Sequence, residues 1–233
     1  MSTQRVAVVG DPSLAAAVET GGGRPVVAGP ADVDDDCEFA VAAGEAALVD
    51  LAREGVTAPV LPVEAGDGVR SVPRSAAADA VESALDGGGS ECSHPVLAAG
   101  AGVRALFDVA LMAAEPARIS EFSVHHDGEQ VARFRADGIV ASTPAGSVGY
   151  SSAAGGPLTA PGTGVLVVVP VAPFATDADR LVLPLDGVER DETPVELLAD
   201  GRTERDVETG DPVDLSPAGA VETLAVPESE LFF

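Results

Sequence analysis

The residues best suited to chemistry lie in one glycine-rich run between Asp137 and Pro157. Residues 139–141 end a short apolar strand, and the next sixteen residues hold four glycines, two prolines and five Ser or Thr side chains besides Tyr150. This composition predicts neither an ordinary helix nor an ordinary strand. Glycine lets backbone amides approach a ligand closely or adopt positive φ, and hydroxyl groups offer small donors to phosphate or ribose. By composition alone the run is either a surface loop or a nucleotide-binding loop.

The order and spacing of this run favour the second interpretation. The succession DG, STPxGS, YS and AGGP resembles the ribose-binding core of the NAD kinase family. Upstream, residues 105–138 resemble that family's passage through two strands to DG. Downstream, residues 165–184 resemble its apolar strand, its Pro-containing turn and its LVLP strand, and LADGR at 198–202 resembles its final DG turn. The resemblance covers roughly Ala105 to Ala218, about half of the chain.

The resemblance implies a specific phosphoryl transfer. NAD kinases move the terminal phosphoryl group of ATP or polyphosphate to the 2′-hydroxyl of the adenosine ribose of NAD, with a divalent metal such as Mg²⁺. The loop residues that match the family, and that we expect to bind NAD, are Asp137, Gly138, Ser142, Thr143, Gly146, Ser147, Tyr150 and Ser151. The alternative to NAD binding is that the glycines and prolines of this run are kept only because they form turns.

The family's phosphate-binding GGDGT motif is degraded in this chain. After an apolar strand ending at Ala42, the corresponding position reads Ala43-Gly44-Glu45-Ala46-Ala47. Glu45 keeps a carboxylate that could accept the hydroxyl proton, but its side chain is one methylene longer, and misplacement of about 1 Å can cost about a hundredfold in rate. Glu45 could equally be a first-turn acid that stabilises a helix N-terminus. Gly44 is the one glycine left to approach a phosphate.

The family's Asn-Glu pair, which reads the adenine end of NAD, aligns with Phe107 and Asp108. Phe107 could stack on a purine, but it cannot donate and accept hydrogen bonds as an amide does. Phe174 stands where the family usually has His. Two functions therefore stay open: an NAD kinase that works with altered motifs, and a weak or inactive paralogue that binds a pyridine or adenine nucleotide in a regulatory or scaffolding role.

The charge of the chain argues against some partners. The net charge is −25, with 38 acidic residues against 13 basic ones, and every basic residue is Arg. Such a surface disfavours nucleic acid and anionic membranes. It suggests a halophilic protein in a cytosol rich in potassium salt, where screening suppresses self-repulsion. Biased base composition of the genome is the alternative cause, since Asn is also missing.

Hydropathy predicts a cytoplasmic protein. The longest apolar runs fall far short of the roughly 20 residues that span a membrane, and no signal peptide opens the chain. From the resemblance we also expect a homo-oligomer, either a dimer or a tetramer.

Cysteine and histidine spacing predicts no metal site. Cys37 and Cys92 are expected to be reduced thiols in the core. His126 leads into Asp127-Gly128, which is typical of a hairpin turn between two strands. Another glycine pair, at 100 and 102, follows no convincing strand, so we do not interpret it as a dinucleotide-binding motif.

The order of elements predicts an α/β plus all-β architecture. Strands alternate with helices in residues 1–89, which indicates a small Rossmann-like N-terminal lobe with a parallel sheet. Helices are expected at 12–20, 46–54 and 75–85. From residue 90 to 220 the pattern changes to short strands between Gly/Pro turns, typical of a β-rich nucleotide-binding lobe like that of NAD kinases. Residues 221–233 are expected to pack back on the first lobe.

Overall fold

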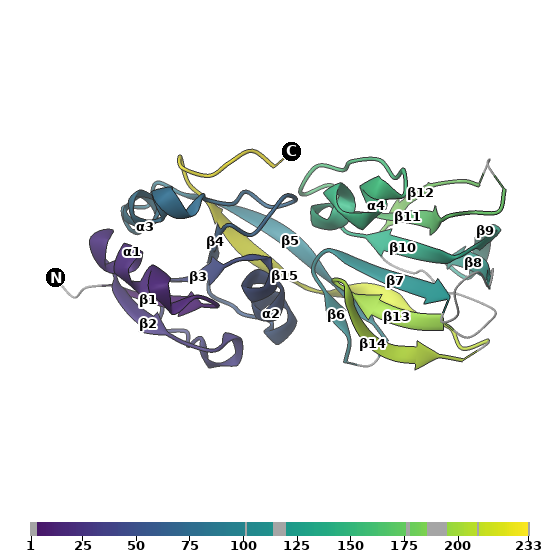
Figure 1. Ribbon diagram of the computed structural model, residues 1–233, viewed down its shortest axis with the longest axis horizontal. Coiled ribbons are helices and arrows are strands. Elements are labelled where there is room, and N and C mark those ends of the chain that lie inside the picture. The colour runs from purple at the N-terminus through teal and green to yellow at the C-terminus, as the bar shows by residue number, and fades with distance from the viewer. Residues whose placement is uncertain are drawn as a thin grey trace. The chain divides into compact units, whose positions relative to one another are not determined.

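The computed structural model describes residues 4–100, 102–113, 120–175, 178–185, 195–208 and 210–232 (Figure 1). Parts of the resembling stretches (114–119 and 176–177), one residue of the glycine pair region (Ala101) and Phe233 lie outside these residues. The chain divides into two compact units. Unit 1 comprises Met1–His94 and Ala220–Phe233, and unit 2 comprises Pro95–Gly219.

Unit 1 is built on a parallel sheet. Its strands are β1 (Arg5–Val9), β2 (Arg24–Val27), β3 (Phe39–Ala43), β4 (Val60–Val63) and the end of β15 (Leu215–Ala225). They lie in the order β2-β1-β3-β4-β15, and each neighbouring pair in that order is parallel. Strands β1, β3 and β4 are buried almost throughout, as expected of a parallel sheet covered on both faces.

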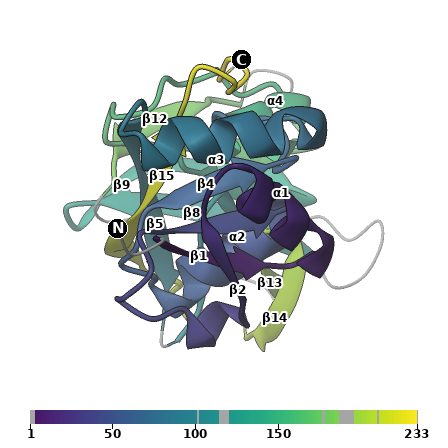
Figure 2. The ribbon, with the colours of Figure 1, turned by 90° about the vertical axis from the view of Figure 1, so that its left-hand side faces the viewer.

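Helices cover this sheet. They are the 3₁₀ turn Pro12–Leu14 with α1 (Ala15–Thr20), α2 (Glu45–Glu54), and the 3₁₀ turn Arg74–Ala76 with α3 (Ala77–Leu85); a further 3₁₀ turn spans Pro30–Asp32. Helices α1 and α3 lie side by side (Figures 1 and 2). Their apolar residues share a core with alternate residues of β1 and β3. The predicted Rossmann-like lobe is confirmed.

Local signals explain where these helices begin and end. The predicted helix at 12–20 begins with a 3₁₀ turn at Pro12, because Asp11 caps this end by accepting the Ser13 amide at 2.9 Å. Helix α2 ends at Gly55, which adopts φ +73 and closes the C-terminus in the left-handed conformation. It begins at Glu45, one residue before the predicted start.

Unit 2 contains a six-stranded antiparallel sheet in the order β12-β11-β10-β7-β13-β14. Its strands are β7 (Asp108–Ala113), β10 (Gly138–Ser142), β11 (Val165–Val171), β12 (Leu181–Pro184), β13 (Val195–Ala199) and β14 (Arg202–Val207). In addition, β5 (Ser90–Ala99) pairs with β6 (Arg104–Ala105) through Leu97 and Ala98. The predicted β-rich lobe is confirmed.

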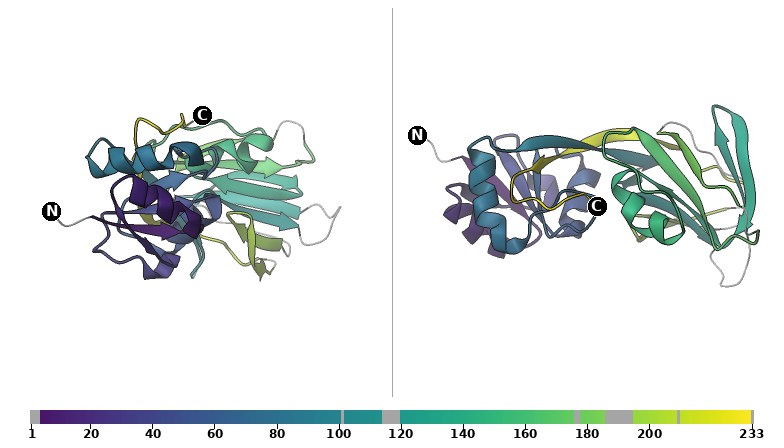
Figure 3. Two further views of the ribbon diagram at one scale, coloured as in Figure 1. Left: turned by 60° about the vertical axis from the view of Figure 1, so that its left-hand side comes forward. Right: turned by 90° about the horizontal axis from the view of Figure 1, so that it is seen from above.

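The two faces of this sheet are covered differently (Figure 3). The hairpin of β8 (Ser120–His126) and β9 (Glu129–Ala136) supplies Phe122 and Val124 to a core with Leu111 and Ile139. On the other face, Ala154 of the glycine-rich run packs on a second cluster. The hairpin turn is the expected one, because Asp127 and Gly128 both adopt positive φ, +53 and +76.

Three sequence expectations need correction. The glycine-rich run is not free of helix: it contains a 3₁₀ turn, Ala145–Val148, and a single α turn, α4 (Tyr150–Ala153). The glycine pair at 100 and 102 does follow a strand, β5, which was missed because half of its residues are polar. A strand rather than a helix comes next, so the dinucleotide motif is absent all the same. Strands β7, β14 and β15 were not predicted either.

No helix within the described residues is long and apolar enough to cross a membrane.

Candidate functional site

The altered GGDGT segment forms a tight turn between β3 and α2 in unit 1. Gly44 has φ +89 and ψ 164, a conformation that side chains rarely adopt, and its amide donates to the Val63 carbonyl at 2.8 Å. Glu45 is the first residue of α2 and is exposed. The first amides of a helix have no intrahelical acceptor, and the helix dipole adds positive potential there. An exposed carboxylate thus stands beside amides suited to an anion.

Two neighbouring turns contact this turn closely. A Cβ on Gly10, which follows β1, would come within 2.7 Å of the Ala43 carbonyl oxygen and 2.9 Å of the Ala47 Cβ. A Cβ on Gly66, in the loop after β4, would come within 3.2 Å of Glu45 Oε2. All three turns follow parallel strands, so they lie at the carboxyl edge of the sheet, where open α/β sheets bind ligands.

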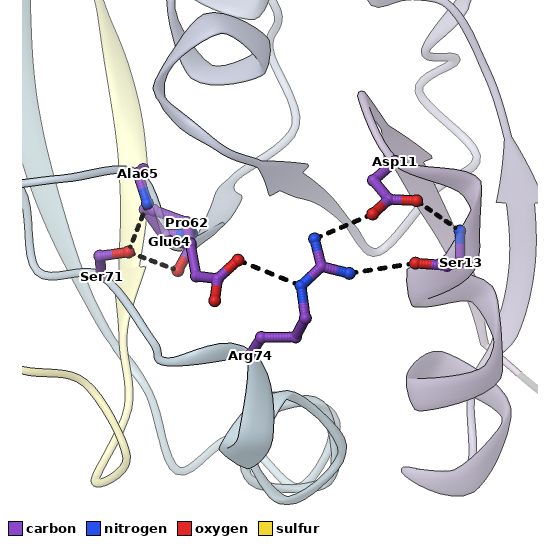
Figure 4. Close-up of polar contacts among 7 residues, drawn as sticks. All are labelled: Asp11, Ser13, Pro62, Glu64, Ala65, Ser71 and Arg74. Carbon is purple, nitrogen blue, oxygen red and sulfur yellow. Dashed lines mark hydrogen bonds and ion pairs between the residues drawn. The ribbon is translucent and has the colours of Figure 1, made fainter.

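One guanidinium joins the two flanking turns (Figure 4). Arg74 lies 2.9 Å from Asp11 Oδ2, donates to Glu64 Oε2 at 3.1 Å, and donates to Ser13 Oγ at 3.0 Å. These carboxylates raise the pKa of Arg74, while hydrogen bonds from Ser13 and then Arg74 lower the pKa of Asp11. Sequence analysis did not single out Arg74. Arg74, Asp11 and Glu64 come from separate parts of the chain, so no local spacing signals their contact.

In unit 2, the sheet register fixes the start of the glycine-rich run. Strand β10 pairs with β7 so that Gly138 faces Met112 and Ser142 faces Asp108. Gly138 has no room for a side chain, because a Cβ would lie 2.4 Å from the Met112 sulfur and 2.7 Å from the Leu111 carbonyl oxygen. This glycine is therefore required by strand packing.

The run then folds back against the backbone of residue 107. The Thr143 hydroxyl donates to the Leu106 carbonyl at 2.7 Å, and the Thr143 amide donates to the Phe107 carbonyl at 2.9 Å. Gly146 is pressed on the same peptide, since a Cβ there would lie 2.0 Å from the Phe107 oxygen. Thr143 and Gly146 thus hold the loop itself in shape.

The other predicted Ser ligands of the loop are buried as well. Ser147 donates to the Pro144 carbonyl at 2.7 Å and accepts the Thr159 amide at 3.1 Å, which ties the start of the run to its exit. Ser142 and Ser151 are fully buried, and their hydroxyls have no hydrogen-bond partner among the described residues. Two of the four predicted Ser and Thr ligands therefore serve the fold, and the hydroxyls of the other two are buried without a partner among the described residues.

The Phe107 and Asp108 positions are organised by a residue that sequence analysis missed. The Asp200 carboxylate accepts the amides of Leu106, Phe107 and Asp108 at 3.1, 2.7 and 3.3 Å. Asp200 adopts φ +48 in the LADGR turn, and that conformation aims its side chain at this segment. The Phe107 side chain is only 8% exposed. Its ring offers little surface to a purine, so the proposed stacking has no support in this conformation.

Three predicted site residues of unit 2 do reach solvent. Tyr150 is 40% exposed, Asp137 is exposed, and Asp108 is partly buried. The Tyr150 hydroxyl contacts the Met112 sulfur at 3.8 Å. Burial raises the pKa of the Tyr150 phenol, and the negative charges of Asp108 and Asp137 raise that pKa further. The phenol is therefore protonated near neutral pH and can donate a hydrogen bond to a ligand oxygen.

A cavity of about 320 Å³ lies beside β9 in the same unit. Its lining includes Phe134, Arg135 and Phe174, and the Phe174 amide donates to the Arg135 carbonyl at 2.8 Å. Phe174, at the position where the family usually has His, is 76% exposed. A phenyl ring cannot replace the hydrogen bonds of an imidazole, so any role of this position in binding has changed.

The fold is that of solved NAD kinases. The structure of an NAD kinase from Archaeoglobus fulgidus in complex with ATP superposes with a TM-score of 0.77 at 19% identity, covering 94% of this chain and 93% of that one. Yeast NADH kinase complexed with NADH superposes with a TM-score of 0.73 at 18% identity, covering 98% and 85%. At this level of identity the likeness establishes the fold alone.

Sequence comparison establishes the family. Residues 107–224, about half of the chain, match the model of the ATP-NAD kinase C-terminal domain, and the chain belongs to that family. The NAD kinase of Gemmatimonas aurantiaca is 45% identical over 98 residues, which cover 41% of this chain and 34% of the relative. The NAD kinase of Methanospirillum hungatei is 36% identical over 120 residues, covering 48% and 43%. The chain thus spans less than half the length of these relatives.

Proposed function

We propose that this chain binds a pyridine dinucleotide and phosphorylates the adenosine ribose 2′-hydroxyl of NAD to give NADP, with ATP or polyphosphate as donor. The observation that carries this proposal is the Gly44–Glu45 turn. It places an exposed carboxylate at the N-terminus of α2 and at the carboxyl edge of a parallel sheet, in a chain of the ATP-NAD kinase family. Among the altered motif's residues, Glu45 is the one able to act as a base.

The proposed roles follow from chemistry. The Glu45 carboxylate accepts the proton of the attacking hydroxyl, which makes the oxygen a better nucleophile toward the terminal phosphorus. The amides of the first turn of α2 face the negative charge of phosphate groups. In unit 2, the exposed Asp137 and the Tyr150 hydroxyl are suited to sugar hydroxyls, as an acceptor and a donor.

Magnesium is proposed to arrive with the phosphoryl donor. Within the described parts of the chain, no three His, Cys, Asp or Glu side chains gather in a way that could hold a metal ion. Mg²⁺ would be bound by the phosphate oxygens of the donor, which are ligands that it prefers.

A second candidate function rests on a separate observation. Phe107 is buried, and the hydroxyls of Thr143 and Ser147 donate to the protein's own backbone carbonyls. A nucleotide-binding paralogue with weak or no kinase activity, acting as a regulator or scaffold, would need no more than this preserved loop. The two functions differ in whether Glu45 matters for product formation.

The first prediction separates these functions. Purified protein with NAD, MgATP and molar KCl should form NADP slowly, and Glu45→Ala should abolish it because the base is lost. Glu45→Gln, which keeps the side-chain shape, should be equally inactive, whereas Glu45→Asp should retain activity. Product is measured by a coupled NADP-specific dehydrogenase, and NAD binding by calorimetry. NAD binding without product at high protein concentration would favour the regulatory function.

We further propose that the protein is a homo-oligomer in solution. The family resemblance supports this proposal, and light scattering in molar KCl tests it: a mass near 23.2 kDa would contradict it.

A further inference from the structure

We propose that Arg74 is a positioning residue that holds the Glu45 carboxylate in place. The inference rests on the proposed function, because it assigns Arg74 to the same turn. Arg74 lies at the start of the 3₁₀ turn before α3, and of the two flanking loops only the one after β4 separates it from Glu45 in sequence. It acts on Glu45 through the two loops that flank the Gly44–Glu45 turn.

The first link runs through the loop after β1. Arg74 pairs with Asp11 at 2.9 Å and donates to Ser13 at 3.0 Å, so it binds both the cap and the first turn of the helix that follows. Gly10, the preceding residue, packs against the Ala43 carbonyl and the Ala47 side chain, which bracket Gly44 and Glu45. A shift of this loop would press directly on the turn, because there is no space for even one more carbon at Gly10.

The second link runs through the loop after β4. Arg74 donates to Glu64 at 3.1 Å. Glu64 adopts φ +52, a costly conformation for a residue with a side chain, and the Ala65 amide beyond it donates to the Ser71 hydroxyl at 2.8 Å (Figure 4). Gly66 follows, against the Glu45 carboxylate. The same guanidinium therefore contacts both of the loops that flank the turn that bears Glu45.

Stability alone does not account for this arrangement. The ion-paired side chains of Arg74, Asp11 and Glu64 are about half exposed, and exposed pairs contribute little to the free energy of unfolding. The effect of these ion pairs on geometry is larger. Without Arg74, the two flanking loops would carry two carboxylates with no cation between them. These like charges would repel one another and push the two loops apart.

The test compares Arg74→Ala with Arg5→Ala. Arg5 is a matched control in the same unit, because it also bridges two carboxylates, Asp34 at 2.8 Å and Asp36 at 3.4 Å, away from the turn. Arg74→Ala should lower kcat by about 10- to 100-fold with little change in the KM for NAD, as expected for a misplaced base. Arg74→Lys, which keeps the charge but not the fork, should fall in between. Both alanine variants should shift Tm equally little.

Two outcomes would overturn the inference. One is a kcat of Arg74→Ala within twofold of the unaltered protein; the other is a loss of kcat fully explained by a lower Tm. Should the unaltered protein form no NADP, hydrogen exchange still decides the question. The Gly44 amide, bonded to the Val63 carbonyl, should exchange faster in Arg74→Ala than in Arg5→Ala if Arg74 positions the turn. Equal exchange would contradict positioning, whatever the activity.

Discussion

At the scale of single residues, His94 shows how burial changes an ordinary side chain. It is 1% exposed, its ring stacks on Phe232 at 6.4 Å, and its Nε2 lies 3.1 Å from the Thr223 hydroxyl. Because Thr223 donates its proton to the Cys92 carbonyl, the imidazole must donate to Thr223. Burial lowers the pKa of His94 to about 4, against a small opposing effect of Glu222. His94 is therefore neutral in the folded protein at pH 6.

Acid should destabilise unit 1 through this residue. The pKa of His94 in the folded protein lies below its unfolded value of about 6.5, so the unfolded chain binds the proton first as pH falls. The free energy of unfolding should drop by up to about 3 kcal/mol between pH 6.5 and pH 4. His94→Gln, which can still donate to Thr223 but does not titrate, should remove this part of the pH dependence. An unchanged slope in denaturant melts of that variant would contradict the prediction.

The carboxylates act in a different pH range. Hydrogen bonds from Ser13 and the Arg74 charge lower the pKa of Asp11, and Arg5 and Cys37 lower the pKa of Asp34. Their stabilising effect is present above their unfolded pKa and is lost only as pH falls through the lower folded values. These two carboxylates therefore contribute little to the change in the free energy of unfolding between pH 6.5 and pH 4.

At the scale of elements, the glycine-rich run packs tightly against the backbone just before β7. Gly146 does not need positive φ, but a Cβ there would overlap the Phe107 carbonyl, a backbone atom that cannot rotate away. Gly146→Ala should lower the stability of unit 2 by about 3 kcal/mol, because overpacking forces the backbone apart. The measurement is thermal melting followed by circular dichroism.

Gly89→Ala provides the control for that change. Its new methyl group would first meet a Val226 side-chain carbon at 3.4 Å, an ordinary contact, and its φ is not positive. It should change Tm far less than Gly146→Ala. Similar Tm values for the two variants would show that the loop can relax around position 146.

The elements also show what sequence could and could not predict. Helix α2 and the hairpin of β8 and β9 were predicted because Gly55 and Asp127-Gly128 are local signals. Strand β5 was missed because its first residues are polar and exposed. The role of Asp200 was out of reach, since it binds Phe107 across 93 positions of the chain. Residue type also does not reveal which of the loop hydroxyls are engaged by the protein's own backbone.

At the scale of the whole molecule, the acidic charge should make stability depend on salt. With a net charge of −25, self-repulsion is strong at low ionic strength, and the Debye length falls from about 10 Å at 0.1 M to about 3 Å at 1 M salt. Tm should therefore rise steadily from 0.1 to 3 M KCl. A Tm that is flat or falls over this range would contradict the proposed adaptation to a salt-rich cytosol.

The path of the chain through the two units constrains how the protein is made. Strand β5 carries the chain out of unit 1 at residue 94, and β15 brings it back at residue 220, where Thr223 pairs with Val60 of β4. During synthesis, the parallel sheet of unit 1 therefore stays incomplete until residues more than a hundred positions later have emerged. Until then its β4 edge is an open template, which makes a nascent chain halted before β15 prone to mispairing and dependent on chaperones.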